Sequence, residues 1–277
     1  MPKPKPKKSD QKPQPQPQIR QPPTPNWPPL RPLLPPTDLH LNPLVHDQIY
    51  LIRNFLPASL CKTYASFLSA LPLTTTPGRP KKDEAVRVND RFQVEDARFA
   101  ENLWGGTALR ELVTERFDED EDVDGYGEEV GSEEEQEGKE EDENEQAKAH
   151  KLRETWGGQP LGLNPNIRIY RYSKGQFFAQ HYDESNTLTY RPASTSKSIP
   201  ARTTWTLLIY LTTCTGGETV FYPDPTRETP NPPPIAVAPE VGLALLHRHG
   251  DRCMVHEGRE VTGGEKWVVR SDLVVAR

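Results

Sequence analysis

The second half of the chain consists of short alternating segments separated by glycine and proline, and this pattern constrains the fold more than any other feature. From about residue 166 to 275, apolar and polar residues alternate with the period of two that β-strands show. No segment between these strands suits the long helical crossover that parallel strands need. The pattern predicts antiparallel strands arranged as a double-sheet jelly roll or a barrel.

The front of the ordered region has a different character and is expected to be partly helical. Apolar residues recur at helical spacing from Ser59 to Leu71, and a second helix is expected over 99–117 with an interruption at Gly105–Gly106. Between them, residues 85–92 read as a strand. Its polar face is either a solvated edge or brings Asn89 and Arg91 to a substrate entrance. The overall class is therefore α+β and mainly β.

Two polar blocks flank and interrupt this region. Residues 1–43 hold 15 of the 30 prolines, so we expect a disordered tail rich in proline and lysine. Residues 118–145 carry 17 Asp or Glu against Lys139 alone, which contributes −16 to the net charge of −6. This density predicts a disordered insertion over 118–147 that either solubilises the surface or binds basic partners. Residues 44–277 then form one domain.

Hydropathy, charge and cysteine content indicate the cellular compartment and the kinds of partner to expect. The chain has no run of 18 apolar residues, which argues against a membrane span, and its N-terminus lacks an apolar signal stretch. Three cysteines are too few for a disulfide framework, so we expect the cytoplasm or nucleus. The acidic block would repel phosphate, which makes a nucleic-acid partner unfavourable.

One short motif contains candidate metal-binding residues. His181 and Asp183 are two positions apart, so on a strand both side chains point to the same side. With the distant His256 they form a set of two imidazoles and one carboxylate, which is the set that holds non-heme Fe(II) on one face. His247 and His249 lie nearby, but their position at a strand end favours satisfied or exposed histidines.

The ordered motifs around this set resemble those of a known family. Residues 170–183 read YRYSKGQFFAQHYD, residues 216–221 read GGETVF, and His256 opens the run HEG. In this order the motifs resemble the Fe(II)/2-oxoglutarate dioxygenases, specifically the prolyl 4-hydroxylase-like branch, over roughly residues 166–275. The resemblance implies a double-stranded β-helix of the cupin-like jelly-roll type, with its catalytic core at about 164–277, buttressed by the N-terminal helices.

The same resemblance implies roles for individual residues. His181, Asp183 and His256 match the iron ligands. Lys266, ten positions after the distal histidine, matches the residue that binds the C5 carboxylate of 2-oxoglutarate, and Tyr172 matches a tyrosine that hydrogen-bonds this co-substrate. Two further residues are less fixed. Thr219 is expected in the same pocket, whereas Arg270, on the same strand face as Lys266, either shares the anchoring role or pairs with Asp272 or substrate.

The implied activity is hydroxylation with Fe(II), 2-oxoglutarate and O2, aided by ascorbate and releasing succinate and CO2. The expected substrate is a protein or peptide side chain. Two alternatives stay open: a catalytically inactive jelly roll used for protein binding, and a nucleic-acid dealkylase of the same superfamily. The second is disfavoured because the final strand lacks the additional arginines of such enzymes.

Overall fold

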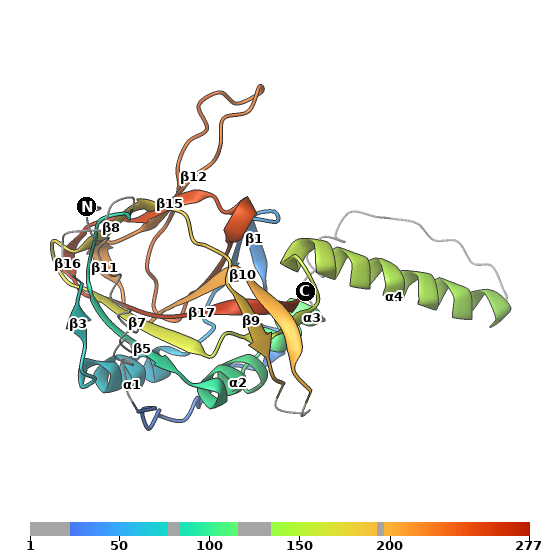
Figure 1. Ribbon diagram of the computed structural model, residues 1–277, viewed down its shortest axis with the longest axis horizontal. Helices are drawn as coiled ribbons and strands as arrows, with labels where there is room; N and C mark the ends of the chain where they lie inside the picture. The colour runs from blue at the N-terminus through green and yellow to red at the C-terminus, as the bar shows by residue number, and fades with distance from the viewer. Residues whose placement is uncertain (1–22, 77–83, 116–133, 193–196) are drawn as a thin grey trace, which may run out of the picture.

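Two antiparallel sheets face each other in the computed structural model, which describes residues 23–76, 84–115, 134–192 and 197–277 (Figure 1). Every strand pairing in these ranges is antiparallel. In spatial order, the larger sheet contains β1 (Asn42–Val45), β2 (Ile49–Ile52), β14 (Ala244–Arg248), β10 (Ile199–Tyr210), β17 (Lys266–Ala276), β7 (Asn166–Tyr172), β5 (Asp90–Glu95) and β3 (Thr74–Thr75), with β6 (Pro160–Leu163) beside β17 and β9 (Thr187–Tyr190) beside β10.

The smaller sheet supplies the opposite wall. Its order is β13 (Ile235–Val237), β12 (Thr219–Tyr222), β15 (Val255–Gly258), β8 (Phe177–His181) and β4 (Arg87–Val88). A two-stranded pair, β11 (Cys214–Gly216) and β16 (Val261–Gly264), lies at one end (Figure 1). Apolar side chains from both sheets form one cluster between them, including Tyr170, Val268 and Phe221. The predicted mainly β jelly roll is confirmed.

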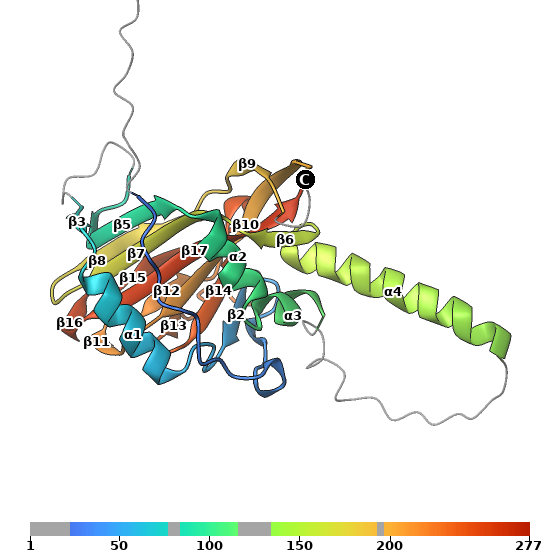
Figure 2. The same cartoon turned by 90° about the horizontal axis from the view of Figure 1, so that it is seen from below.

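Helices cover the outer face of the larger sheet. Figure 2 shows α1 (Ala58–Ser69), α2 (Ala97–Gly105) and α3 (Leu109–Thr114) on this face. The Asp96 side chain caps α2 by accepting a hydrogen bond from Phe99 N at 2.9 Å. The predicted helical break at Gly105–Gly106 separates α2 from α3. The described ranges also contain two short 3-10 helices, η1 (Pro36–Asp38) and η2 (Gly250–Arg252).

The expected disordered tail is wrong for residues 23–43, which pack on the helices. The Trp27 ring stacks on Phe99 with centroids 4.1 Å apart, and its Nε1 donates to Asp96 Oδ2 at 2.8 Å. The Tyr64 hydroxyl donates to the Pro28 carbonyl at 2.7 Å. A few apolar residues within a proline-rich stretch thus provide enough contact area to offset the cost of ordering it. Residues 1–22 lie outside the described part.

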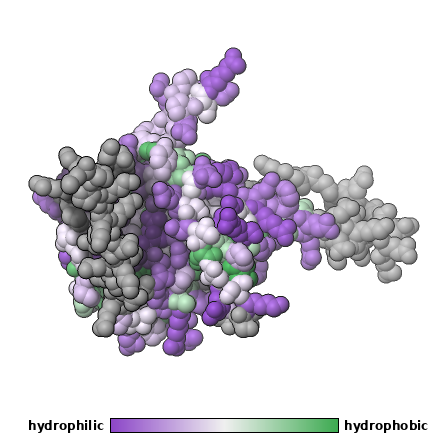
Figure 3. Space-filling model, in the orientation of Figure 1, coloured by the Kyte–Doolittle hydropathy of each residue, from purple (hydrophilic) through white to green (hydrophobic). Residues whose placement is uncertain are grey.

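Within the expected disordered insertion, residues 134–147 form the first part of α4 (Glu134–Trp156). Glu, Gln, Lys and Ala are good helix formers, and here they are joined to an anchored end. Trp156 is fully buried against Trp205, with ring centroids 5.0 Å apart. The described part of α4 presents a hydrophilic surface (Figure 3). The rest of the insertion that was expected to be disordered, residues 118–133, lies outside the described ranges.

No helix in the described ranges has both the length and the apolar character that crossing a bilayer requires.

Candidate metal centre

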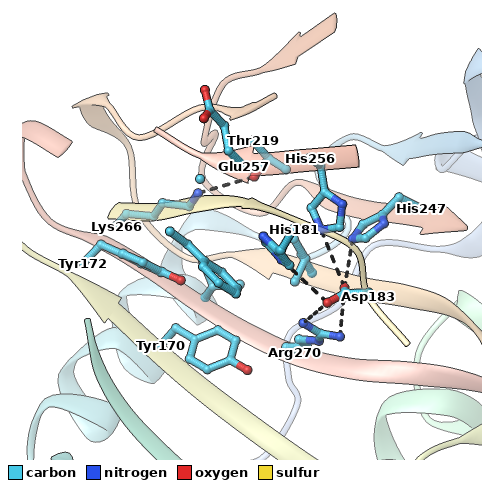
Figure 4. Close-up of a pocket in the computed structure, with 14 residues that line it drawn as sticks. Tyr170, Tyr172, His181, Asp183, Thr219, His247, His256, Glu257, Lys266 and Arg270 are labelled. Carbon is cyan, nitrogen blue, oxygen red and sulfur yellow. Dashed lines mark hydrogen bonds and ion pairs between the residues drawn. The ribbon is translucent and has the colours of Figure 1, made fainter. Parts of the chain in front are cut away.

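The three side chains predicted to bind iron meet on two neighbouring strands of the smaller sheet. His181 ends β8 and pairs in register with His256 of β15, and Asp183 follows two residues after His181. One potential ligand atom from each of the three residues lies within 4.8 Å of the other two (Figure 4). Strand pairing therefore closes a gap of more than 70 residues in the sequence.

Hydrogen bonds to the backbone decide which nitrogen of each imidazole is available. His181 Nδ1 lies 2.9 Å from the carbonyl oxygen of Ala179, and His256 Nδ1 lies 3.0 Å from that of Met254. Because a carbonyl only accepts, Nδ1 carries the proton in both rings. The unprotonated Nε2 atoms then face Asp183, His181 Nε2 at 3.7 Å from Oδ1 and His256 Nε2 at 3.7 Å from Oδ2. This is the tautomer that binds metals through Nε2.

The charge states of these groups also suit a cation. Burial lowers the pKa of His181 to about 3, and burial likewise lowers the pKa of His256, so both rings are neutral at neutral pH. Burial alone would raise the pKa of Asp183, but the Arg270 guanidinium holds it well below its usual range. Two neutral imidazoles and one ionised carboxylate therefore converge on one point.

Lys266 is a buried cation in the same cavity. Its Nζ donates to the Gly217 carbonyl at 2.7 Å and lies 3.4 Å from Thr219 Oγ1. Burial lowers the pKa of Lys266 to about 8. Among the described residues no carboxylate lies within ion-pair distance of Nζ. A buried ammonium without an anionic partner is costly, and an anionic ligand would supply that partner.

The seven residues predicted for iron and 2-oxoglutarate line one cavity. Tyr172 pairs with Lys266 in register on β7 and β17. The Tyr172 hydroxyl has no hydrogen-bond partner in the part of the chain that the structure describes. The seven are His181, Asp183, His256, Lys266, Tyr172, Thr219 and Arg270.

The two residues proposed for a substrate entrance lie elsewhere. The predicted strand over 85–92 is split between β4 in the smaller sheet and β5 in the larger, and Asn89 sits buried at the break. Arg91 donates to Gln93 Oε1 at 2.5 Å and lies in a different surface hollow. Neither Asn89 nor Arg91 lines the cavity of His181. Arg87, the third basic or polar residue of that face, instead lies over the Phe178 ring at 4.8 Å.

His247 is the site residue that sequence reasoning missed. It is 2% exposed, lines the cavity and has Nε2 at 3.7 Å from Asp183 Oδ2. His247 does lie near a strand end, as expected, because β14 ends at Arg248, but its ring is buried and not exposed. Alternation along this strand places Leu245 and His247 on the same side, facing the cluster between the sheets, and that periodicity was the available signal.

The chemistry of the three candidate ligand side chains indicates which metal ion the site suits. Two histidines with unprotonated Nε2 atoms and one ionised carboxylate form the facial set that non-heme Fe(II) uses. Their Nδ1–H groups are held by backbone carbonyls, as outer partners of metal-bound histidines commonly are. The residues present fit Fe(II).

Comparison with known proteins agrees with this chemistry. Residues 167–271 match the family model of the 2OG-Fe(II) oxygenase superfamily. No curated protein sequence matches the chain. Solved structures similar to it include the viral collagen prolyl hydroxylase of Paramecium Bursaria Chlorella virus-1, at 15% identity and a TM-score of 0.42, covering 83% of this chain and 97% of that one.

Two further solved structures show the same level of likeness. A Pseudomonas putida prolyl-4-hydroxylase is 12% identical with a TM-score of 0.45, covering 83% of this chain and 93% of that one. A Trichoplax adhaerens prolyl hydroxylase in complex with a hypoxia inducible factor peptide fragment is 13% identical with a TM-score of 0.44, covering 82% and 83%.

The superfamily of the matched model uses Fe(II) and 2-oxoglutarate together with O2. The matched segment contains His181, Asp183 and His256 as well as Lys266. Over residues 167–271, which contain the candidate metal ligands, this chain is therefore similar to the 2OG-Fe(II) oxygenase superfamily.

Proposed function

We propose that this enzyme hydroxylates a protein or peptide side chain, as the prolyl 4-hydroxylase-like branch does, with release of succinate and CO2. The observation that supports it best is one cavity that holds both a metal-binding triad and the buried cation Lys266, which has no carboxylate partner among the described residues. The resemblance of the motifs to that branch, and the peptide bound to the Trichoplax enzyme, support a peptide substrate.

Different residues of the cavity bind the metal and the co-substrate. His181, Asp183 and His256 hold Fe(II), which with 2-oxoglutarate and O2 supplies the oxidising power for hydroxylation of a C–H bond. Lys266 binds the distal carboxylate of 2-oxoglutarate by a charge-assisted hydrogen bond. Tyr172, opposite Lys266, orients that co-substrate through its free hydroxyl.

Apolar side chains surround the metal-binding triad and limit the access of water to it. The ring of Phe178 stacks on His181 with centroids 3.5 Å apart and helps to exclude water from the ligand. Leu208 and Val268 add apolar lining from the larger sheet. An apolar lining lowers the local dielectric constant and so strengthens the attraction between Lys266 and an anionic co-substrate.

Co-substrate turnover is the first test. Purified chain supplied with Fe(II), 2-oxoglutarate and O2 should release succinate, and Asp183→Ala should abolish the release. A control variant, His150→Ala, changes an exposed histidine of α4 and should behave as wild type. Unchanged turnover in Asp183→Ala would refute the metal site, and absence of Fe(II) and 2-oxoglutarate binding in the wild type would favour the inactive-module alternative.

The substrate class needs a separate experiment. Peptide libraries incubated with the active enzyme should yield products heavier by one oxygen atom, and products labelled from ¹⁸O2 would show that the oxygen comes from dioxygen. Active co-substrate turnover with no labelled peptide, but with labelled small molecules or nucleic acid, would overturn the peptide assignment and leave the enzyme class intact.

A further inference from the structure

Neighbouring side chains hold both carboxylate oxygens of Asp183, and Figure 4 shows the contact with Arg270. Oδ2 accepts from the Thr206 hydroxyl at 2.8 Å and lies 2.9 Å from Arg270 Nη2. Oδ1 accepts from Arg270 Nη1 at 3.1 Å and has no second hydrogen bond within the described ranges. A carboxylate oxygen offers about two lone pairs. Arg270 Nη2 donates its hydrogens to Thr206 Oγ1 at 3.3 Å and Asp272 Oδ1 at 3.5 Å. Each oxygen of Asp183 therefore accepts one hydrogen bond and keeps a lone pair available.

The direction of the hydrogen bonds behind Thr206 follows from its neighbours. Thr206 has one hydroxyl proton and gives it to ionised Asp183, so Thr206 Oγ1 must accept from His249 Nδ1 at 3.0 Å. His249 Nε2 is then an acceptor for the Thr203 hydroxyl at 2.9 Å, and Thr203 Oγ1 accepts from the backbone N–H of Asn186. Every donor in this buried chain has one acceptor.

Arg270 is held from behind by opposite charges. Its Nη2 lies 3.5 Å from Asp272 Oδ1, and Asp272 in turn forms an ion pair with Arg168. The sequence Asp183, Arg270, Asp272, Arg168 thus alternates in charge and sums to zero. The side chains of Arg270 and Asp272 are 10% and 1% exposed. Because breaking a buried pair leaves an uncompensated charge, each member resists displacement of the next.

We propose that Arg270 is a positioning residue that clamps Asp183, with Thr206 and His249 behind it, so that the carboxylate is held in place to bind the metal. In this proposal Arg270 contacts the metal ligand Asp183, and Lys266 alone binds the distal carboxylate of the co-substrate. The clamp rests on the proposed function only in that Asp183 is a metal ligand.

The test separates metal affinity from co-substrate affinity in the full chain. Mn(II) binding and, at saturating Mn(II), 2-oxoglutarate binding would be measured by calorimetry for Arg270→Gln, Arg270→Lys and Thr206→Val. Loss of an outer partner of a metal ligand typically weakens metal binding about 10- to 100-fold. We expect that loss for Arg270→Gln, a smaller loss for the other two, and little change in 2-oxoglutarate affinity once the metal is bound.

A matched control is available on the neighbouring strand. Arg171 of β7 also binds an aspartate, with Nη2 at 2.8 Å from Asp90 Oδ2, but does not line the cavity. Arg171→Gln breaks a comparable ion pair and should leave Mn(II) affinity unchanged. Co(II) spectra add a readout of geometry, because displacement of Asp183 changes the arrangement of ligand atoms around the ion. Arg270→Gln should alter that spectrum and Arg171→Gln should not.

The outcomes are distinguishable. Wild-type Mn(II) affinity and an unaltered Co(II) spectrum in the folded Arg270 variants would overturn the clamp and leave the proposed function standing. Loss of 2-oxoglutarate binding with unchanged Mn(II) binding would make Arg270 a co-substrate anchor instead. A wild-type chain that binds no divalent metal would overturn both proposals. If Arg270→Gln fails to fold, Arg270→Lys and Thr206→Val decide the matter by the same measurements.

Discussion

His181 and His256 face each other across the pairing of β8 and β15, and each ring donates its Nδ1–H to the carbonyl two residues before it. This repeated arrangement gives both imidazoles the same tautomer and turns both Nε2 atoms toward Asp183. Metal binding then requires no rotation of either ring to expose a lone pair.

His256→Ala should remove one of the three proposed ligand atoms and lower metal affinity by more than the roughly 100-fold effect of losing an outer partner. Metal content per chain after dialysis, together with calorimetric titration of Mn(II), measures this. Exposed His150 again provides the matched control, and its replacement by alanine should leave metal content unchanged. Full metal occupancy in folded His256→Ala would remove His256 from the proposed site.

2-Oxoglutarate binding should weaken as the pH rises through about 8, because burial lowers the pKa of Lys266 to about 8 and the deprotonated amine has no charge for a carboxylate. Affinity should be steady below that pH and should fall about tenfold per pH unit above it. Calorimetry between about pH 7 and about pH 9 with Mn(II) present checks the profile.

Two variants of Lys266 sharpen this prediction. Lys266→Arg keeps its charge at all these pH values, so its binding curve should lose the alkaline fall. Lys266→Met lacks the charge-assisted hydrogen bond, worth about 1.5–3 kcal/mol, and should bind 2-oxoglutarate roughly 10- to 100-fold more weakly at neutral pH. An alkaline fall of the same size in Lys266→Arg would attribute the transition to another group.

Tyr172→Phe should raise the dissociation constant for 2-oxoglutarate about 3- to 10-fold, the effect of losing one hydrogen bond, and leave Mn(II) affinity unchanged. The hydroxyl removed has no partner within the described ranges, so its loss should cost little stability. Tyr190→Phe is the matched control, since Tyr190 is also buried but packs with Ala201 and Val274 away from the cavity. Equal effects of both variants on 2-oxoglutarate would argue against contact between Tyr172 and the co-substrate.

Trp27→Ala should lower the free energy of unfolding by about 2 kcal/mol, because it removes a half-buried ring stacked on Phe99 and a hydrogen bond to Asp96. Chemical denaturation of the full chain measures the change. The neighbouring Asn26 is exposed, so Asn26→Ala should have little effect. No destabilisation by Trp27→Ala would mean that residues 23–43 add nothing to the stability of the domain.

The sequence by itself determined the β-sheet pattern and grouped seven of the residues that line the cavity. Alternation with a period of two predicted the strands, and a strand places residues two apart on the same side, which grouped His181 with Asp183. These are local consequences of backbone geometry. Local pattern failed for residues 23–43, because the apolar surface that orders them belongs to α1 and α2, far along the chain.

Only the tertiary structure decided how the site is held. Strand register brought His256 opposite His181, and placed His247, which sequence reasoning had set aside as a ligand, against Asp183. It also directed Arg270 toward Asp183 and left Lys266 without a carboxylate, although both lie on the same face of β17. Sequence parity gives the face of a strand, but the partner across that face depends on which distant strand packs there.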